Sequence, residues 1–214
     1  MSGGLAIPAD VRVVVFDVVG TLVEPWPPVP QAYRDVARRH GIEREIEELR
    51  RGFAAAWRRQ EALDAAARPA HATSRERERD RWRSIVFDVF AHASASDAIF
   101  ADLWEHFGRP ESWRPLATGS ELARSALAAG LEIALASNFD ERLHAVAAAV
   151  EPLSWATHVF ASSELGWRKP APEFFRMIEG RLGLRPHELL LVGDDPQLDI
   201  VAASQAGWHA RSIG

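Results

Sequence analysis

The pattern of apolar and polar residues divides the chain into two kinds of structure. Residues 11–23 read VRVVVFDVVGTLV, a run of β-branched residues that ends at Asp17 and leads into a Gly-Thr turn. Such a run is typical of a buried strand followed by a loop. From Tyr33 to Phe107 the apolar residues recur at helical spacing among Ala, Arg and Glu. We therefore expect one strand at the front of the chain and an all-helical block after it.

After Trp113, strand and helix signals alternate. The expected elements are a helix that opens with a capping box at Thr118–Glu121 and ends at Gly130, strand 131–136, a helix from Asp140, strand 157–162, a helix after Pro170, strand 189–192, a helix after Pro196 and a last strand over 208–213. This alternation predicts parallel strands with helices on both faces. The expected fold class is α/β, with the first strand in the same sheet and the helical block inserted after it.

The expected domains follow from this division. Residues 1–24 and 113–214 form an α/β core, residues 25–112 form a helical domain, and the Pro-rich stretch Glu24–Pro30 is the hinge. In the helical domain, the run Arg75–Arg83 carries opposite charges at helical spacing, which is typical of a solvated helix face.

Composition and charge exclude several classes of protein. The chain has no cysteine, which removes disulfides, thiolate zinc sites and iron–sulfur clusters and favours the cytoplasm. Its 25 basic and 30 acidic residues give a net charge of −5, which argues against nucleic acid or an anionic membrane as a partner. No apolar run approaches the roughly 20 residues of a membrane span, and the first residues lack the pattern of an export signal. The oligomeric state stays open.

Polar residues follow the ends of the predicted strands, where open α/β sheets bind ligands. They are Asp17 and Thr21, Ser137 and Asn138, Lys169, and Asp194 with Asp195 and Asp199. Lys169 is the one lysine in a chain that otherwise uses arginine, so this position needs a compact ammonium group that a planar guanidinium cannot replace.

Two of these residues also fit purely structural roles. Asn138 with Glu141 fits the first turn of a helix, and Asp195 before Pro196 fits a helix N-cap followed by proline. The same sequence features therefore serve both a structural and a functional interpretation.

The acidic residues need a neutralising partner. If Asp17 and Asp194 converge at about 4 Å, they repel by roughly 4 kcal/mol at an effective dielectric constant near 20. The candidates are a shared proton, Lys169 or a bound cation. Carboxylates without histidine or thiol ligands suit Mg²⁺, and the eight histidines show no pairing typical of a zinc site.

This set of groups suits phosphoryl transfer through an acyl phosphate on the protein. Asp17 would attack phosphorus, and Mg²⁺ would bridge Asp17, Asp194 and a phosphate oxygen. Ser137 and Lys169 would offset the charge on the other phosphate oxygens. A small phosphorylated metabolite is the expected substrate.

Four motifs, in this order, resemble those of the haloacid dehalogenase-like (HAD) hydrolase superfamily, in the branch with a helical cap inserted after the first motif: FDVVGTL, LASN, GWRKPAPEFF and LVGDDPQLD. The resemblance implies a Rossmann-like core under that cap. It also implies residue roles: Asp17 as nucleophile, Ser137 as phosphate-binding residue, Lys169 as charge partner, Asp194 and the carbonyl of Val19 as Mg²⁺ ligands, and Asp195 and Asp199 as supporting acids. We expect Thr21, Asn138 and Lys169 to bind the substrate together with Ser137.

One position departs from the family pattern. Phosphatases that this chain resembles place a general acid two residues after the nucleophile, where this chain has Val19. General acid–base assistance is worth roughly 100- to 10,000-fold, so hydrolysis of alkyl phosphates should be slow. Two alternatives follow: a 2-haloacid dehalogenase, whose leaving halide needs no proton, and a silent protein that binds a phosphorylated ligand or a partner protein. The acidic GDDPQLD motif argues against the dehalogenase.

Three residues in or near the hinge could overhang the site. Trp26, Tyr33 and Arg34 follow the first motif closely, and Arg34 could hold a substrate anion, although a surface role is the ordinary one for an arginine here.

Overall fold

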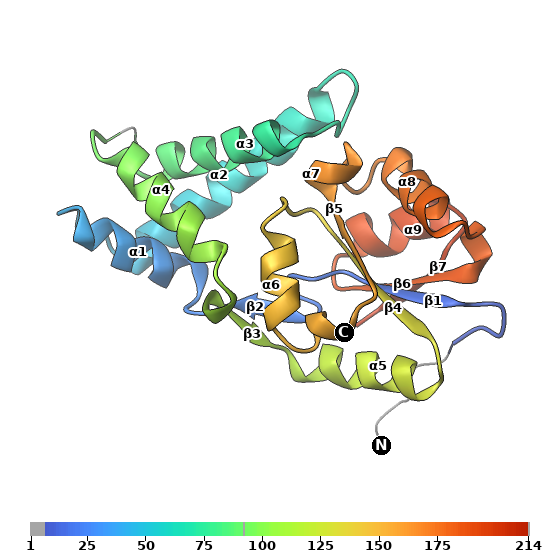
Figure 1. The fold of residues 1–214 in the computed structure, drawn as a ribbon. Helices are drawn as coiled ribbons and strands as arrows, with labels where there is room; N and C mark the ends of the chain where they lie inside the picture. Colours follow the sequence, from blue (N-terminus) through green and yellow to red (C-terminus); the bar gives the residue numbers. More distant parts are fainter. Residues whose placement is uncertain (1–6, 92, 214) are drawn as a thin grey trace.

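The computed structural model describes residues 7–91 and 93–213. Its centre is a five-stranded parallel sheet in the order β5-β4-β1-β6-β7 (Figure 1). The strands are β1 (Val13–Phe16), β4 (Glu132–Ser137), β5 (His158–Ala161), β6 (Leu189–Gly193) and β7 (His209–Ser212). The first strand therefore lies in the middle of the sheet, between two strands that come more than a hundred residues later. This confirms the expected α/β fold.

Alternating side chains of β1 supply two separate cores. Val14 and Phe16 pack on one face with α5 (Ala117–Ala128) and α6 (Leu143–Ala149). On the other face the sheet packs against α8 (Pro172–Leu182) and α9 (Ala202–Gln205), where the side chains of Val13 and Val15 contribute. Successive residues of a strand point to opposite faces, so a strand buried on both sides needs an unbroken apolar run.

The helical block is a separate four-helix unit, which we call the helical insert. It consists of α1 (Val29–Arg39), α2 (Ile46–Ala66), α3 (Arg75–Val89) and α4 (Ser96–Phe107). The insert has its own core, in which the ring of Tyr33 lies between Phe53 and Phe90. Tyr33 is therefore used for packing, and the expectation that it overhangs the site is wrong.

A small antiparallel sheet joins the helical insert to the parallel sheet. It pairs β2 (Val23–Pro25) with β3 (Trp113–Pro115), the segments that enter and leave the insert. The expected domain boundaries, after residues 24 and 112, fall at this junction and stay predictions. The remaining short elements are η1 (Pro110–Ser112), η2 (Leu153–Trp155), α7 (Ser162–Leu165), η3 (Pro186–Glu188) and η4 (Pro196–Val201).

Two local expectations were wrong. The helix expected to open with a capping box at Thr118–Glu121 already begins at Ala117, and no side chain caps it. The hydroxyl of Ser120 instead donates to the carbonyl of Leu116 at 2.8 Å, one turn earlier. The charged run on α3 is not wholly solvated either, because Glu78 and Arg81 are buried.

The described residues include no helix that is long and apolar enough to cross a membrane. The expectation that the chain carries no export signal concerns its first residues, of which 1–6 lie outside the described part.

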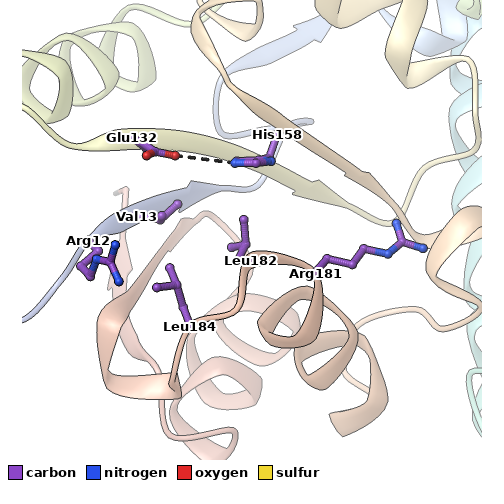
Figure 2. Close-up of a pocket in the computed structure, with 7 residues that line it drawn as sticks. All are labelled: Arg12, Val13, Glu132, His158, Arg181, Leu182 and Leu184. Atoms are coloured by element: carbon purple, nitrogen blue, oxygen red, sulfur yellow. Dashed lines mark ion pairs between the residues drawn. The ribbon is translucent and has the colours of Figure 1, made fainter.

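One cavity lies at the amino ends of the central strands, away from the predicted site. Figure 2 shows it, with the ion pair between Glu132 and His158 at 3.6 Å on its wall. Its volume is about 140 Å³, and its lining consists of Arg12, Val13, Glu132, His158, Arg181, Leu182 and Leu184. None of the residues singled out in the sequence lines it, because Asp17, Ser137 and Asp194 lie at the opposite edge of the sheet.

Gly119 gives a direct test of how the first loop packs on α5. A Cβ atom at this position would lie 2.1 Å from the carbonyl oxygen of Thr21. We expect Gly119→Ala to lower the free energy of unfolding by about 1–3 kcal/mol, because main chain must move. The matched control is Gly180→Ala on the open face of α8, where a Cβ meets nothing within 4 Å. It should add roughly 0.5–1 kcal/mol in urea denaturation. Equal stabilities would contradict the packing described here.

Candidate active site

The site forms where three neighbouring strands end at the same edge of the sheet. Phe16 of β1 pairs with Leu135 of β4 and with Val192 of β6. The parallel register therefore brings Asp17, which follows β1, level with the last residues of both neighbours. Ser137 closes β4, and Asp194 follows β6 directly. Residues more than a hundred positions apart thus meet because parallel strands expose their carboxyl ends together.

Lys169 links the acidic residues of this edge. Its Nζ atom donates to Oδ1 of Asp17 at 2.7 Å and to Oδ1 of Asp199 at 2.6 Å. A third bond, of 3.2 Å, goes to the carbonyl of Ala136 in β4. The lysine is 2% exposed, so all of its hydrogen-bonding capacity is used inside the protein. Three donors in three directions are what an ammonium group offers.

Asn138 holds the main chain of the lysine. Its Oδ1 atom accepts from the N–H of Lys169 at 2.8 Å, and its Nδ2 atom donates to the carbonyl of the same residue at 3.0 Å. The interpretation of Asn138 as a helix cap is wrong, because α6 begins only at Leu143 and Asn138 makes no capping hydrogen bond. Contact of Asn138 with a substrate stays a prediction.

Asp194 lies against the turn that follows β1. Its Oδ1 atom accepts from the hydroxyl of Thr21 at 2.9 Å. Gly20 has a φ of +91°, and a Cβ there would lie 2.5 Å from Oδ2 of Asp194. Only glycine tolerates both the backbone conformation and this approach. Thr21 has no exposed surface, so in this structure it orients Asp194, and its contact with a substrate stays a prediction.

Asp195 and Asp199 organise the turn after β6. Asp195 caps η4, because its side chain accepts from the N–H groups of Gln197 and Leu198. This confirms the structural interpretation of Asp195. Asp199 accepts from the N–H of Asp195 at 3.1 Å through Oδ2, while its Oδ1 atom binds Lys169. Both oxygens of Asp199 are therefore occupied.

The site carries more negative than positive charge. Asp17, Asp194 and Asp199 offer oxygens that all lie within 4.8 Å of one another, around one ammonium group. Burial raises the pKa of Asp17 from 3.8 to about 6, Lys169 opposes this, and the charges of Asp199 and Asp194 add to it. The pKa of Lys169 is raised by the two carboxylates that it binds, despite burial. The lysine thus stays charged and neutralises only part of the cluster.

The donor set fits a hard divalent cation such as Mg²⁺. Carboxylate and carbonyl oxygens are its preferred protein ligands. Lys169 takes one oxygen of Asp17, and Thr21 takes one oxygen of Asp194, so each of the two carboxylates retains an oxygen. The carbonyl of Val19 accepts no hydrogen bond from the backbone of the described residues. Asp17, Asp194 and Val19 therefore fit the role of ligands better than Asp199.

The position two residues after Asp17, where the resemblance predicts a general acid in phosphatases, is accessible. Val19 is 37% exposed and carries no ionisable group. Trp26 is also exposed, under the guanidinium of Arg114, and Arg34 bonds to Gln31 within α1. Neither observation brings Trp26 or Arg34 to the reacting groups, and their overhang stays a prediction.

Sequence reasoning missed Arg168, which is 2% exposed and pairs with Glu78 of the helical insert. The available signal was its position directly before the single lysine, in a segment already recognised as a motif.

Comparisons with known proteins show the family of the chain. A family model described as haloacid dehalogenase-like hydrolase matches residues 11–207. Haloacid dehalogenase-like hydrolase domain-containing protein 3 of Homo sapiens is 29% identical over 206 residues, which are 94% of this chain and 81% of that protein. Fructose-1-phosphate phosphatase YqaB of Escherichia coli (strain K12) is 26% identical over 208 residues, 93% and 94% of the two chains.

Solved structures share the fold. A defluorinating L-2-haloacid dehalogenase superposes with a TM-score of 0.73 at 20% identity, over 94% of this chain and 80% of that one. At this level of identity the match establishes the architecture alone.

The raised pKa of Asp17 predicts a pH dependence of stability without metal. Between the ordinary pKa of 3.8 and the native value of about 6, the unfolded chain has released a proton that the native site retains. This contribution is therefore fully present below pH 3.8 and is lost as the pH rises through 6. Urea denaturation in EDTA should therefore show that the free energy of unfolding falls less between pH 4 and 7 for Asp17→Asn than for the wild type. Asp80→Asn, on the exposed side of α3, is the control, and identical slopes for all three proteins would contradict the prediction.

Proposed function

Because the chain belongs to the haloacid dehalogenase-like hydrolase family, as its four motifs predicted, we propose that it is a Mg²⁺-dependent phosphatase-type hydrolase that works through an aspartyl phosphate on Asp17. The observation that carries the proposal is the surplus of carboxylates around a single ammonium group. Holding this surplus is unfavourable without a cation. The relative named as a fructose-1-phosphate phosphatase supports a small phosphorylated metabolite as substrate. A cytoplasmic location and an absence of nucleic acid or membrane partners are part of the same proposal.

The nucleophile is prepared by its neighbours. Lys169 binds Oδ1 of Asp17 and orients this carboxylate, one oxygen of which would attack phosphorus. That oxygen forms a bond to phosphorus as the bond to the leaving oxygen breaks, and water later attacks phosphorus to free Asp17. When bound by Asp17, Asp194 and the carbonyl of Val19, Mg²⁺ would offset the charge of the phosphoryl group. Ser137 lies at the same edge and would bind another phosphoryl oxygen, while the charge of Lys169 would offset part of the phosphoryl charge.

Proton transfer is the weak step of this site. The side chain of Val19 cannot protonate a leaving alkoxide or take a proton from water. Aryl and acyl phosphates release anions that need no proton, so they are the substrates that the site should handle best.

A dehalogenase is the second candidate, and Val19 is the observation that favours it. Displacement of halide from carbon by Asp17 needs no acid at position 19, and the fold is shared with haloacid dehalogenases. Asp194 argues against this function, because a metal-free reaction gains nothing from another carboxylate beside the nucleophile. Val19 is equally compatible with a silent protein that binds a phosphorylated ligand.

Assays of three ligands separate these candidates. We expect the protein to hydrolyse p-nitrophenyl phosphate slowly with Mg²⁺ and to stop in EDTA. Asp17→Asn should lower the rate on the order of 1,000-fold or more, because the nucleophile is gone. Asp194→Asn should raise the Mg²⁺ concentration for half-maximal rate by about 10-fold or more, with Asp80→Asn as the matched control.

Other outcomes identify the alternatives. Release of chloride from 2-chloropropionate in EDTA would establish the dehalogenase instead. Silence with both substrates, together with a higher melting temperature in the presence of phosphate and Mg²⁺, would identify a binding protein.

Substitution of Val19 tests the missing acid. We expect Val19→Asp to raise turnover of an alkyl phosphate such as glycerol phosphate by about 10-fold or more, since general acids contribute roughly 100- to 10,000-fold in optimised sites. Turnover of p-nitrophenyl phosphate should rise less, because its leaving group needs no proton. Val19→Asn matches the size and polarity without the acid, so equal rates for the two variants would show that proton transfer is not the limiting step.

A further inference from the structure

The turn between α2 and α3 is docked on the segment that carries Lys169. Ala72 and Trp167 pair as an antiparallel bridge. The N–H of Thr73 donates to the carbonyl of Gly166 at 2.9 Å, and the N–H of Arg168 donates to the carbonyl of His71 at 3.0 Å. Figure 1 shows the end of the α2–α3 hairpin next to α7, far from the β2–β3 junction. The helical insert therefore touches the α/β part at its tip as well as at its two connections.

Side chains reinforce this contact with a largely buried group of charges, in which only Arg77 is exposed and which we call the seam cluster. It contains three arginines and three acids: Arg77, Arg81 and Arg168 with Glu61, Asp64 and Glu78. Arg168 and Glu78 are 2% and 1% exposed. The Nη1 atom of Arg168 donates to both oxygens of Glu78, at 2.6 and 2.7 Å. Its Nη2 atom reaches Glu61 of α2 at 3.4 Å, so one guanidinium binds two helices of the insert.

A gain in stability does not by itself account for the seam cluster. Removing charges from water costs several kcal/mol per ion in general, and well-packed apolar residues often replace buried ion pairs without loss. What a balanced cluster provides is a defined register, because a shifted seam would leave charges unpaired. Here the seam cluster fixes the alignment of the helical insert with the segment that carries Arg168 and Lys169.

Arg168 and Lys169 are fixed from opposite directions. Asn138 holds the main chain of Lys169 to the α/β part, while the helical insert holds the side chain of Arg168. Nζ of Lys169 must reach two carboxylates at 2.6–2.7 Å, so a small movement of the segment breaks at least one bond. Thr73 of the insert adds a bond of 2.9 Å to Glu78, which locks the acceptor in turn.

We propose that Arg168 is a positioning residue, which sets the place of the Lys169 ammonium group through its ion pair with Glu78 of the helical insert. The role of Lys169 in phosphate chemistry rests on the proposed function, whereas the coupling of Arg168 and Glu78 to the lysine does not.

The single lysine permits a test that does not depend on activity. In protein labelled with ¹³C,¹⁵N-lysine, Lys169 is the one labelled side chain. We expect Glu78→Gln to shift and broaden the Cε signal. Glu76→Gln, the same change two residues away on the exposed side of α3, should leave the signal in place. Unchanged signals in a folded Glu78→Gln variant would overturn the proposal.

Kinetics separate this proposal from the proposed function. With p-nitrophenyl phosphate, Glu78→Gln should lower kcat by about 10- to 100-fold with little change in KM, as expected for misplaced reacting groups. Glu76→Gln should match the wild type. If the wild type itself is inactive, the proposed function fails, while the lysine spectra still decide the coupling.

A disulfide across the seam provides the second measurement. Ala72 and Trp167 lie between the two bridging hydrogen bonds, as in a non-hydrogen-bonded antiparallel pair with a Cα separation of about 4.5 Å. This separation falls within the range that disulfides span. The chain has no cysteine, so Ala72→Cys with Trp167→Cys creates one possible bridge.

The bridge should substitute for the ion pair. In the Glu78→Gln background we expect oxidation to restore the wild-type lysine signal and rate, and dithiothreitol to remove both. In the double-cysteine protein that keeps Glu78, oxidation should alter neither the lysine signal nor the rate. This measurement remains possible if the Glu78→Gln variant does not fold. Loss of activity on oxidation would mean that the seam must open during turnover and would overturn the proposal, as would a bridge that forms without rescue.

Discussion

The structure depends on one buried ammonium group. Lys169 joins the carboxylate that follows β1 to Asp199 of η4 and to the carbonyl of Ala136 in β4, so three separate segments meet on one atom. A buried lysine is unfavourable unless its charge is matched, and here it is matched by an excess of carboxylates. The excess also shapes the site, because the charges of Asp199 and Asp194 add to the effect of burial in raising the pKa of Asp17, and carboxylate oxygens remain that do not bind the lysine.

Much of the fold could be predicted because its determinants are local. The unbroken apolar run of β1 is needed to fill two cores at once, and such a run is visible in the sequence. The site residues could be predicted for the same reason: parallel strands end at one edge, so Asp17, Ser137 and Asp194 had to meet there. Asp195 was interpreted correctly because its hydrogen bonds reach only two and three residues ahead.

The failures share a physical cause. Asn138 has a possible local partner in the sequence, but a polar side chain can bond to any group within reach, and the fold decides which group that is. The hydrogen-bond partner of the Asn138 side chain is the main chain of Lys169, 31 residues away. Glu78 and Arg81 have helical neighbours of opposite charge, yet their actual partners come from α2 and from Arg168. Spacing within a helix shows which charges could pair, and it does not show which face another segment will cover.

The seam cluster limits how the missing acid at position 19 could be supplied. A proton donor must come within hydrogen-bond distance of the leaving oxygen. The helical insert lies outside the α/β sheet and contacts the segment that carries Lys169. The pairing of Arg168 with Glu78 holds the tip of the insert to this segment. A proton donor on the insert would therefore keep a fixed position relative to Lys169 as long as the seam contacts persist. It would not approach the site through a movement of the whole insert. Selectivity for a substrate would then arise from leaving groups that fit under a fixed insert, or that depart without a proton.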